Sequence, residues 1–315
     1  MKPPVQPLGA SRWRQIGLIT LGAGALFIGF RYLPTGTNLS HMDFRVTGGN
    51  SIEFCDPLNP QFIPVVAVRS PVTMTLTPAT AEVKPGIEGH FALTLVTASG
   101  KRIAPEDLLV THTRRLHLLI IDPWLDDYQH VHPEPGRQPG EWAFAFKPKR
   151  AGVYRVFADF TPAATARGLY ASADLPVGGA RLPTGLTLIM QHEPAWTAER
   201  AGYRFALTPA TEPVRARQPV DLTFTVVKAE GGAVPLEPVM GAFAHLVAFD
   251  EARSGFAHLH PTETDVTKSP DPVRPVLHFK ITIPQPGRYV IWSQVKLGGR
   301  DVFAPFWFEV EGEPD

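Results

Sequence analysis

The feature that most constrains the fold of this chain is a pattern of histidines and apolar residues that its sequence contains twice. The segment 117–122 reads His-Leu-Leu-Ile-Ile-Asp, and eight residues after its Asp comes His-Val-His-Pro at 130–133. The segment 245–250 reads His-Leu-Val-Ala-Phe-Asp, and the same interval leads to His-Leu-His-Pro at 258–261. Agreement in both residues and spacing indicates an internal duplication.

The duplication extends well beyond the histidines. Leu-Thr-Pro-Ala-Thr at 76–80 returns at 207–211, and Gly-Val-Tyr at 152–154 returns as Gly-Arg-Tyr at 287–289. The repeated unit is therefore a domain of about 110 residues. Two related domains are expected in tandem.

Each copy consists of short apolar runs separated by Pro, Gly and Asp, which is typical of strands joined by turns. The chain has 33 prolines in 315 residues, and proline breaks helices but is tolerated at turns and strand edges. About seven strands per copy predict a sandwich. We therefore predict a mainly β fold with two tandem immunoglobulin-like antiparallel β-sandwich domains, at 71–180 and 186–312.

The expected strands follow these apolar runs. The runs include 72–77, 91–97, 116–121, 142–146 and 154–160 in the first domain, and 186–190, 203–207, 220–227, 245–249, 276–283, 289–295 and 302–310 in the second. The last of them is apolar on both faces near its start. Either it is a central strand, or one of its faces contacts something outside its own domain.

The N-terminal segment predicts a single transmembrane helix at 13–33. At about 1.5 Å per residue, such a helix is about as long as the hydrocarbon core is thick. Lys2, Arg12 and Arg14 precede its uncharged, mostly apolar run at 15–30, and no acidic residue occurs before Asp43. The positive-inside rule then makes 1–12 a cytoplasmic tail and puts the rest outside. We expect the bacterial inner membrane, with the bulk of the chain periplasmic.

A cleaved signal peptide is the alternative to an uncleaved anchor. No Ala-x-Ala cleavage site follows the apolar stretch, and this favours the anchor. Residues 34–70 have little periodicity and are expected to form an extended lead-in segment before the first domain.

Composition and motifs exclude several classes of protein. The chain has 30 basic and 30 acidic residues without a long basic run, so nucleic acid is not expected as a partner. The single cysteine, Cys55, excludes a disulfide within the chain and any Cys-x-x-Cys motif. Nucleophile-elbow, zincin, Walker and dinucleotide-binding motifs are absent from the sequence, so we predict that the protein is not an enzyme.

The histidines are the candidate metal ligands. On a strand, His130 and His132 project from one face, and so do His258 and His260, because strand side chains alternate. A third imidazole from the neighbouring strand, His117 or His245 respectively, could converge with each pair. Three imidazoles can bind zinc or copper.

Met240 extends the second candidate set. It precedes His245 by five residues, where the first copy has His112. A thioether beside imidazoles would favour copper(I), whereas a blue-copper site would need a cysteine that neither copy provides. The alternative is structural: one imidazole of each pair bonds a backbone carbonyl and the other pairs with Asp122 or Asp250.

Parts of each repeat resemble the YtkA-like periplasmic immunoglobulin-type domains. In the second copy the resemblance is carried by His-Leu-Val-x-x-Asp, Phe-x-His-x-His-Pro, Pro-Gly-x-Tyr-x-x-Trp-x-Gln and Ala-Pro-Phe at 245–250, 256–261, 286–294 and 304–306. It covers neither the anchor nor the lead-in segment. The first copy departs from it, with Asp159 in place of Gln294. The resemblance implies copper handling or the assembly of membrane electron-transfer complexes.

Two functions are therefore predicted. The first is a non-catalytic, membrane-anchored periplasmic accessory subunit of a respiratory or photosynthetic electron-transfer complex. It would require no cofactor and would contact the bilayer and other protein subunits. The alternative is a membrane-tethered copper or zinc protein. Its candidate ligands are His245, His258, His260 and Met240, with His117, His130 and His132 in the first copy.

Overall fold

The computed structural model describes residues 10–31, 39–45, 60–68, 70–80, 82–178 and 192–312. The chain divides into two compact units, 1–38 and 39–315. The prediction of a mainly β chain is confirmed, because strands make up most of the regular structure in the second unit. Cys55 and the strand expected at 186–190 lie outside the described residues.

The first unit contains helix α1 (Ala10–Arg31), which overlaps the segment predicted as a span at 13–33. Among the helices in the described ranges, none joins sufficient length to sufficient apolar character for a bilayer crossing. The helix itself is thus confirmed with different bounds. Its role as an anchor, and the location at the bacterial inner membrane, stay predictions.

Residues 70–178 form the first sandwich, which consists of two antiparallel four-stranded sheets. One sheet has the order β1 (Val72–Pro78), β2 (Gly89–Thr97), β6 (Glu141–Phe146) and β5 (Glu134–Pro135). The other has the order β4 (Tyr128–Val131), β3 (Leu116–Ile121), β7 (Gly152–Phe160) and β8 (Leu169–Val177).

Residues 192–312 form the second sandwich from equivalent elements. Its outer sheet has the order β16 (Val276–Thr282), β12 (Pro219–Lys228), β10 (Tyr203–Pro209) and β9 (Thr197–Arg200). Its inner sheet has the order β11 (Val214–Arg215), β18 (Arg300–Glu311), β17 (Gly287–Leu297), β14 (His245–Asp250) and β15 (Phe256–Leu259), with β13 (Leu236–Glu237) also paired to β17. Short 3-10 helices occur at η1 (His41–Phe44) and η2 (Pro105–Asp107).

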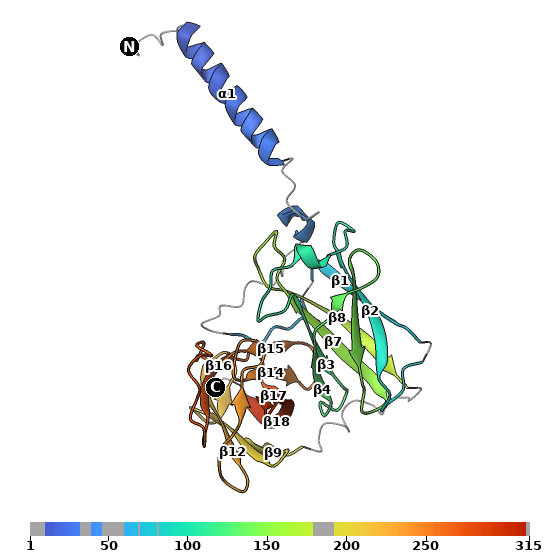
Figure 1. The fold of residues 1–315 in the computed structure, drawn as a ribbon, viewed down its shortest axis with the longest axis vertical. Helices are drawn as coiled ribbons and strands as arrows, with labels where there is room; N and C mark the ends of the chain where they lie inside the picture. Colours follow the sequence, from blue (N-terminus) through green and yellow to red (C-terminus); the bar gives the residue numbers. More distant parts are fainter. Residues whose placement is uncertain are drawn as a thin grey trace. The chain divides into compact units, whose positions relative to one another are not determined.

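A third apolar core, in addition to one inside each sandwich, lies between the two sandwiches. It contains side chains from β3, β4, β7 and β8 of the first sandwich and from β14, β15, β17 and β18 of the second. We call it the interface core; its buried members are Ile63, Val65, Leu119, Ile121, Leu125, Tyr128, Phe157, Tyr170, Val247, Phe249, Phe256, Val290, Trp292 and Trp307. Figure 1 shows the ribbons of β3 and β4 beside those of β14 and β17. The two sandwiches therefore pack sheet against sheet.

Strand β3 shows why its sequence is apolar at almost every position. All six of its residues are buried. Leu118 and Ile120 enter the core of the first sandwich, whereas Leu119 and Ile121 enter the interface core. A strand covered on both faces loses the apolar and polar alternation that a half-exposed strand shows.

The last strand, β18, follows the same principle. Phe306 and Phe308 pack inside the second sandwich, while Trp307 enters the interface core and Phe303 packs against it. Among the described residues, the first part of β18 (300–306) pairs with β17 alone, because β11 joins it only at Val310 and Glu311. Of the two alternatives predicted for the start of this strand, contact with the other domain is the one that holds.

The end of the lead-in segment is built into this interface. Ile63 exchanges backbone hydrogen bonds of 2.8 and 3.1 Å with Phe256, at the start of β15. The side chains of Ile63 and Val65 are buried in the interface core, whereas Phe62 enters the core of the second sandwich. The lead-in segment thus contacts the second sandwich as well as the first.

Candidate metal centre

Strand periodicity places the repeated histidines on the faces that meet at the interface. His117 precedes Leu119 by two residues in β3, and His130 follows Tyr128 by two in β4. Side chains two apart share a face of a strand, and Leu119 and Tyr128 both lie in the interface core. In the second sandwich, His245 precedes Val247 by two residues, and His258 and His260 follow Phe256 by two and four. Val247 and Phe256 lie in the interface core, so these histidines face the interface as well.

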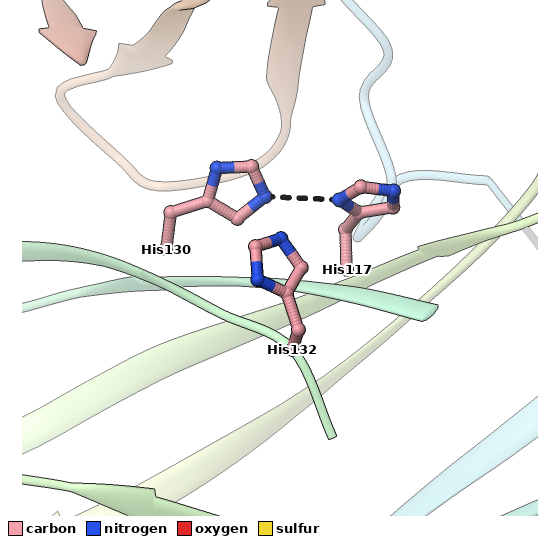
Figure 2. Close-up of side chains that lie close together, drawn as sticks. All are labelled: His117, His130 and His132. Carbon is pink, nitrogen blue, oxygen red and sulfur yellow. Dashed lines mark hydrogen bonds between the residues drawn. The ribbon is translucent and has the colours of Figure 1, made fainter. Parts of the chain in front are cut away.

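The first three histidines, His117, His130 and His132, form a compact triad. One ring nitrogen of each lies within 4.8 Å of the corresponding atoms of the other two. His117 Nδ1 and His130 Nε2 are 3.1 Å apart. Figure 2 shows these two rings facing each other across the dashed contact, with the His132 ring beside them. The structure therefore brings together the three residues that the sequence grouped.

The second triad consists of His245, His258 and His260, and it meets the same 4.8 Å criterion. Its ring centroids are 4.7 to 5.6 Å apart, much like the 4.7 to 5.3 Å of the first triad. His117 and His245 are almost fully buried, and the His258 side chain is only 5% exposed. The duplication has thus produced two nearly equivalent sites.

The outward nitrogens of His117 and His245 bond backbone carbonyls of their own sandwich. His117 Nε2 lies 3.0 Å from the Thr111 carbonyl oxygen, and His245 Nε2 lies 2.9 Å from that of Val239. A carbonyl oxygen only accepts, so each Nε2 donates and each Nδ1 keeps its lone pair. These bonds fix the tautomer and orient Nδ1 towards the triad.

The outward nitrogens of His130 and His258 bond side chains of the opposite sandwich. His130 Nδ1 lies 3.0 Å from Gln294 Oε1, and His258 Nδ1 lies 3.0 Å from Asp159 Oδ2. Asp159 pairs with His117 in the β3–β7 register, and Gln294 pairs with His245 in the β14–β17 register. Each triad is thus supported by a residue that lies next to the buried histidine of the other triad, on the neighbouring strand.

Gln294 is oriented by a further bond, because its Nε2 donates to Asp301 Oδ2 over 3.1 Å. Its Oε1 is therefore the atom that accepts from His130 Nδ1. It follows that His130 Nε2 carries a lone pair, as His117 Nδ1 does. The two nitrogens face each other with lone pairs at 3.1 Å. Because lone pairs repel, this contact is favourable only with a cation between the two nitrogens.

The remaining inward nitrogens also lack partners. His132 Nε2, His245 Nδ1, His258 Nε2 and His260 Nε2 are buried without a hydrogen bond. Buried polar atoms are rarely left unsatisfied in native proteins. Together with the facing pair in the first triad, they give each triad one Nδ1 and two Nε2 atoms directed inward.

Burial keeps these imidazoles neutral. It lowers the pKa of His245 to about 4, although the Val239 carbonyl acts against this, and lowers that of His132 to about 3. Burial is also the main cause of the lowered pKa of His117 and His260, and it holds the pKa of His130 and His258 well below the usual range. Metal ligation requires the neutral form.

A seventh histidine, His112, completes the cluster. Its ring stacks on that of His260, with centroids 3.6 Å apart and an interplanar angle of 17°. It lies in the turn Thr111–Arg114 and is exposed to solvent. The sequence singled out His112 only as the counterpart of Met240. Its contact with the second triad could not be predicted, because that contact depends on how the sandwiches pack.

Met240, Asp122 and Asp250 were also named from the sequence as neighbours of the histidines. Met240 lies in the turn Val239–Ala242, equivalent to the turn that holds His112. Its role as a ligand stays a prediction. The expected pairing of histidines with Asp122 or Asp250 is wrong. Each carboxylate accepts backbone N–H groups of the following turn, at 2.7 and 3.0 Å for Asp122 and at 2.7 and 3.2 Å for Asp250.

Comparison with known proteins identifies a family. A family model described as "Domain of unknown function (DUF8832)" matches residues 67–173 and again residues 198–312, once in each sandwich. The chain belongs to this family. Among curated proteins, none matches the sequence.

Several solved structures are similar to parts of the chain. One is the Escherichia coli adhesin FdeC, with 18% identity, 76% of this chain and 64% of that chain covered, and a TM-score of 0.22. Another is a putative membrane-anchored protein of Corynebacterium diphtheriae, with 9% identity, 78% and 60% covered, and a TM-score of 0.22. The fibronectin(III)-like modules of Clostridium thermocellum CbhA share 9% identity, with 76% and 95% covered and a TM-score of 0.17. The chain spans less than two thirds of the first two structures.

Proposed function

We propose that this member of the DUF8832 family is a copper-binding protein, with zinc as the alternative ion, and that its histidine triads hold the metal. The observation that carries the proposal is the pair of facing lone pairs on His117 Nδ1 and His130 Nε2, 3.1 Å apart. Ligand nitrogens of one metal ion, each about 2.0 to 2.1 Å from it, are separated by a similar distance. The burial that lowers the pKa of both histidines works against a proton in that position.

The ligand set favours copper among the transition metals. Imidazole suits copper, zinc, iron and nickel, and divalent copper binds most tightly of the first-row series. The second nitrogen of each supported histidine bonds a carbonyl, an amide oxygen or a carboxylate, as ligating histidines in metalloproteins do. Three protein ligands also leave an open coordination position, as in catalytic zinc sites.

The accessory-subunit role stays a prediction beside this proposal. Anchoring by α1, contact with a bilayer and contact with subunits of an electron-transfer complex are compatible with a metal-binding pair of sandwiches. We propose no catalytic role for the chain. Purification in mild detergent checks the accessory role, since a chain that is extracted alone, without a co-migrating partner, contradicts it.

The test of metal binding uses the full chain. The protein is stripped with a chelator, loaded with copper or zinc, desalted and analysed for metal. We expect at least one equivalent to be retained, whereas less than a tenth of an equivalent contradicts the proposal. His117→Gln removes an inward nitrogen and should lower retention.

The matched control is His90→Gln. His90 lies in β2, its side chain is 72% exposed, and its Nε2 lies 3.9 Å from a carboxylate oxygen of Glu88, so it is no part of either triad. Retention should equal that of the unmodified chain. An equal loss in both variants would place the metal elsewhere.

A further inference from the structure

Resting on the proposed metal binding, we infer that the two triads are the halves of one two-metal centre, and that the half formed by His245, His258 and His260 binds its ion more tightly. The inference concerns how many ions the chain holds and in what order. It is independent of whether the ion is copper or zinc.

The distances between the triads indicate that they form one centre. The rings of His130 and His258 have centroids 5.3 Å apart, and those of His117 and His258 are 5.7 Å apart. Rings within a triad are separated by the same amounts, for example 5.3 Å between His117 and His130. The six imidazoles therefore form one continuous cluster. With about 2 Å from metal to nitrogen and about 1 Å from nitrogen to ring centroid, two bound ions would be no more than about 12 Å apart.

Hydrogen bonds across the interface also connect the two triads. Gln294 of the second sandwich orients His130 of the first, and Asp159 of the first orients His258 of the second. Partners of this kind set the tautomer and the direction of the ligating nitrogen. Each site is therefore complete only when both sandwiches are packed together, and occupancy of one site stabilises the geometry of the other.

The two halves differ in the partner behind the central histidine. The second triad has the carboxylate of Asp159 on His258 Nδ1, and the first has the neutral amide of Gln294 on His130 Nδ1. A carboxylate makes the opposite ring nitrogen a stronger donor to a metal than a neutral amide does. We therefore assign the tighter site to the second triad, which His112 also covers by stacking on His260.

The experiment is a copper(II) titration of the stripped full chain, followed by electron paramagnetic resonance. The first equivalent should give the spectrum of an isolated ion, and the second should add dipolar broadening from the neighbouring ion. Copper binding without a second equivalent, or two equivalents without spin coupling, overturns this inference but leaves the proposed function intact. Failure to bind any copper or zinc overturns both.

Three variants test the order of filling. Asp159→Asn should weaken the tighter site by about 10- to 100-fold. Gln294→Glu combined with Asp301→Asn should strengthen the weaker site, because the amide introduced at position 301 can donate to the new carboxylate, which Asp301 would repel. His130→Gln should abolish spin coupling while one ion remains. A gain of affinity cannot result from misfolding, so unchanged affinity in a folded double variant contradicts the assignment.

Discussion

His130 of the first sandwich donates its Nδ1 proton to Gln294 Oε1 of the second sandwich over 3.0 Å. The equivalent bond in the other direction, at the same 3.0 Å, joins His258 of the second sandwich to Asp159 of the first. The duplication thus yields a pair of sites, each of which depends on both domains. Docking of the sandwiches therefore forms two of the hydrogen bonds that orient the candidate metal ligands.

Trp292 tests this dependence on docking. Its Nε1 donates to the Leu125 carbonyl of the other sandwich over 3.1 Å, inside the interface core. Trp292→Phe leaves that carbonyl without this donor, which costs about 1–3 kcal/mol. We expect urea unfolding of the metal-free chain to shift accordingly, and copper affinity to fall with it. Trp196→Phe, in a half-buried residue of the second sandwich's own core, should leave copper affinity unchanged. Equal copper affinity in all three proteins contradicts the dependence.

Gly255 tests the role of the lead-in segment. A Cβ atom at this position would lie 1.9 Å from the carbonyl oxygen of Ile63, so the backbone itself would have to move. Gly255→Ala should displace the segment that buries Ile63 and destabilise the chain by about 2–4 kcal/mol in urea unfolding. The control is Gly312→Ala, because no atom lies within 4 Å of a Cβ there. Unchanged stability of Gly255→Ala would mean that the segment does not pack as described.

Acid should destabilise the metal-free chain over a defined pH window. The pKa of His245 is lowered to about 4 and that of His132 to about 3, while the unfolded value is near 6.5. Below pH 6.5 the unfolded chain binds more protons, so stability falls as the pH falls. Each such histidine lowers the free energy of unfolding by up to about 1.4 kcal/mol per pH unit, which amounts to on the order of 3 kcal/mol for the two between pH 6.5 and 5. Urea unfolding in the presence of a chelator measures this, and a flat profile contradicts it.

Met240 is expected to select the oxidation state of copper. Met240→Leu keeps the side chain apolar and of similar volume but removes the thioether. If the sulfur ligates, copper(I) affinity should fall by about tenfold while zinc affinity stays the same, because a thioether is a soft ligand. Competition titrations with a copper(I) chelator measure the difference. Equal copper(I) affinities would remove Met240 from the ligand set.

The local geometry of each triad follows from sequence alone. A two-residue spacing puts His130 and His132 on one face of a strand, and the repeat with a preceding histidine indicates convergence. The expected strand at 116–121 has the observed bounds of β3. These relationships involve only neighbouring strands of one sheet, so residue spacing determines them.

The meeting of the two triads could not be derived in this way, because it depends on which sheets pack together. The sequence did contain one indication that a sheet of the first sandwich is covered on both sides. The unbroken apolar run of β3 is typical of a strand buried on both faces, and both of its faces are buried. The partners Asp159 and Gln294 were noticed only as a difference between the copies. Asp122, which the structural alternative paired with a histidine, accepts the N–H groups of its own turn instead.

The most direct measurement is anomalous diffraction at the copper absorption edge from crystals of the copper-loaded full chain. We predict two peaks at the interface of the sandwiches, one surrounded by His117, His130 and His132 and the other by His245, His258 and His260. Copper bound elsewhere on the chain, with no peak at either triad, would contradict the account.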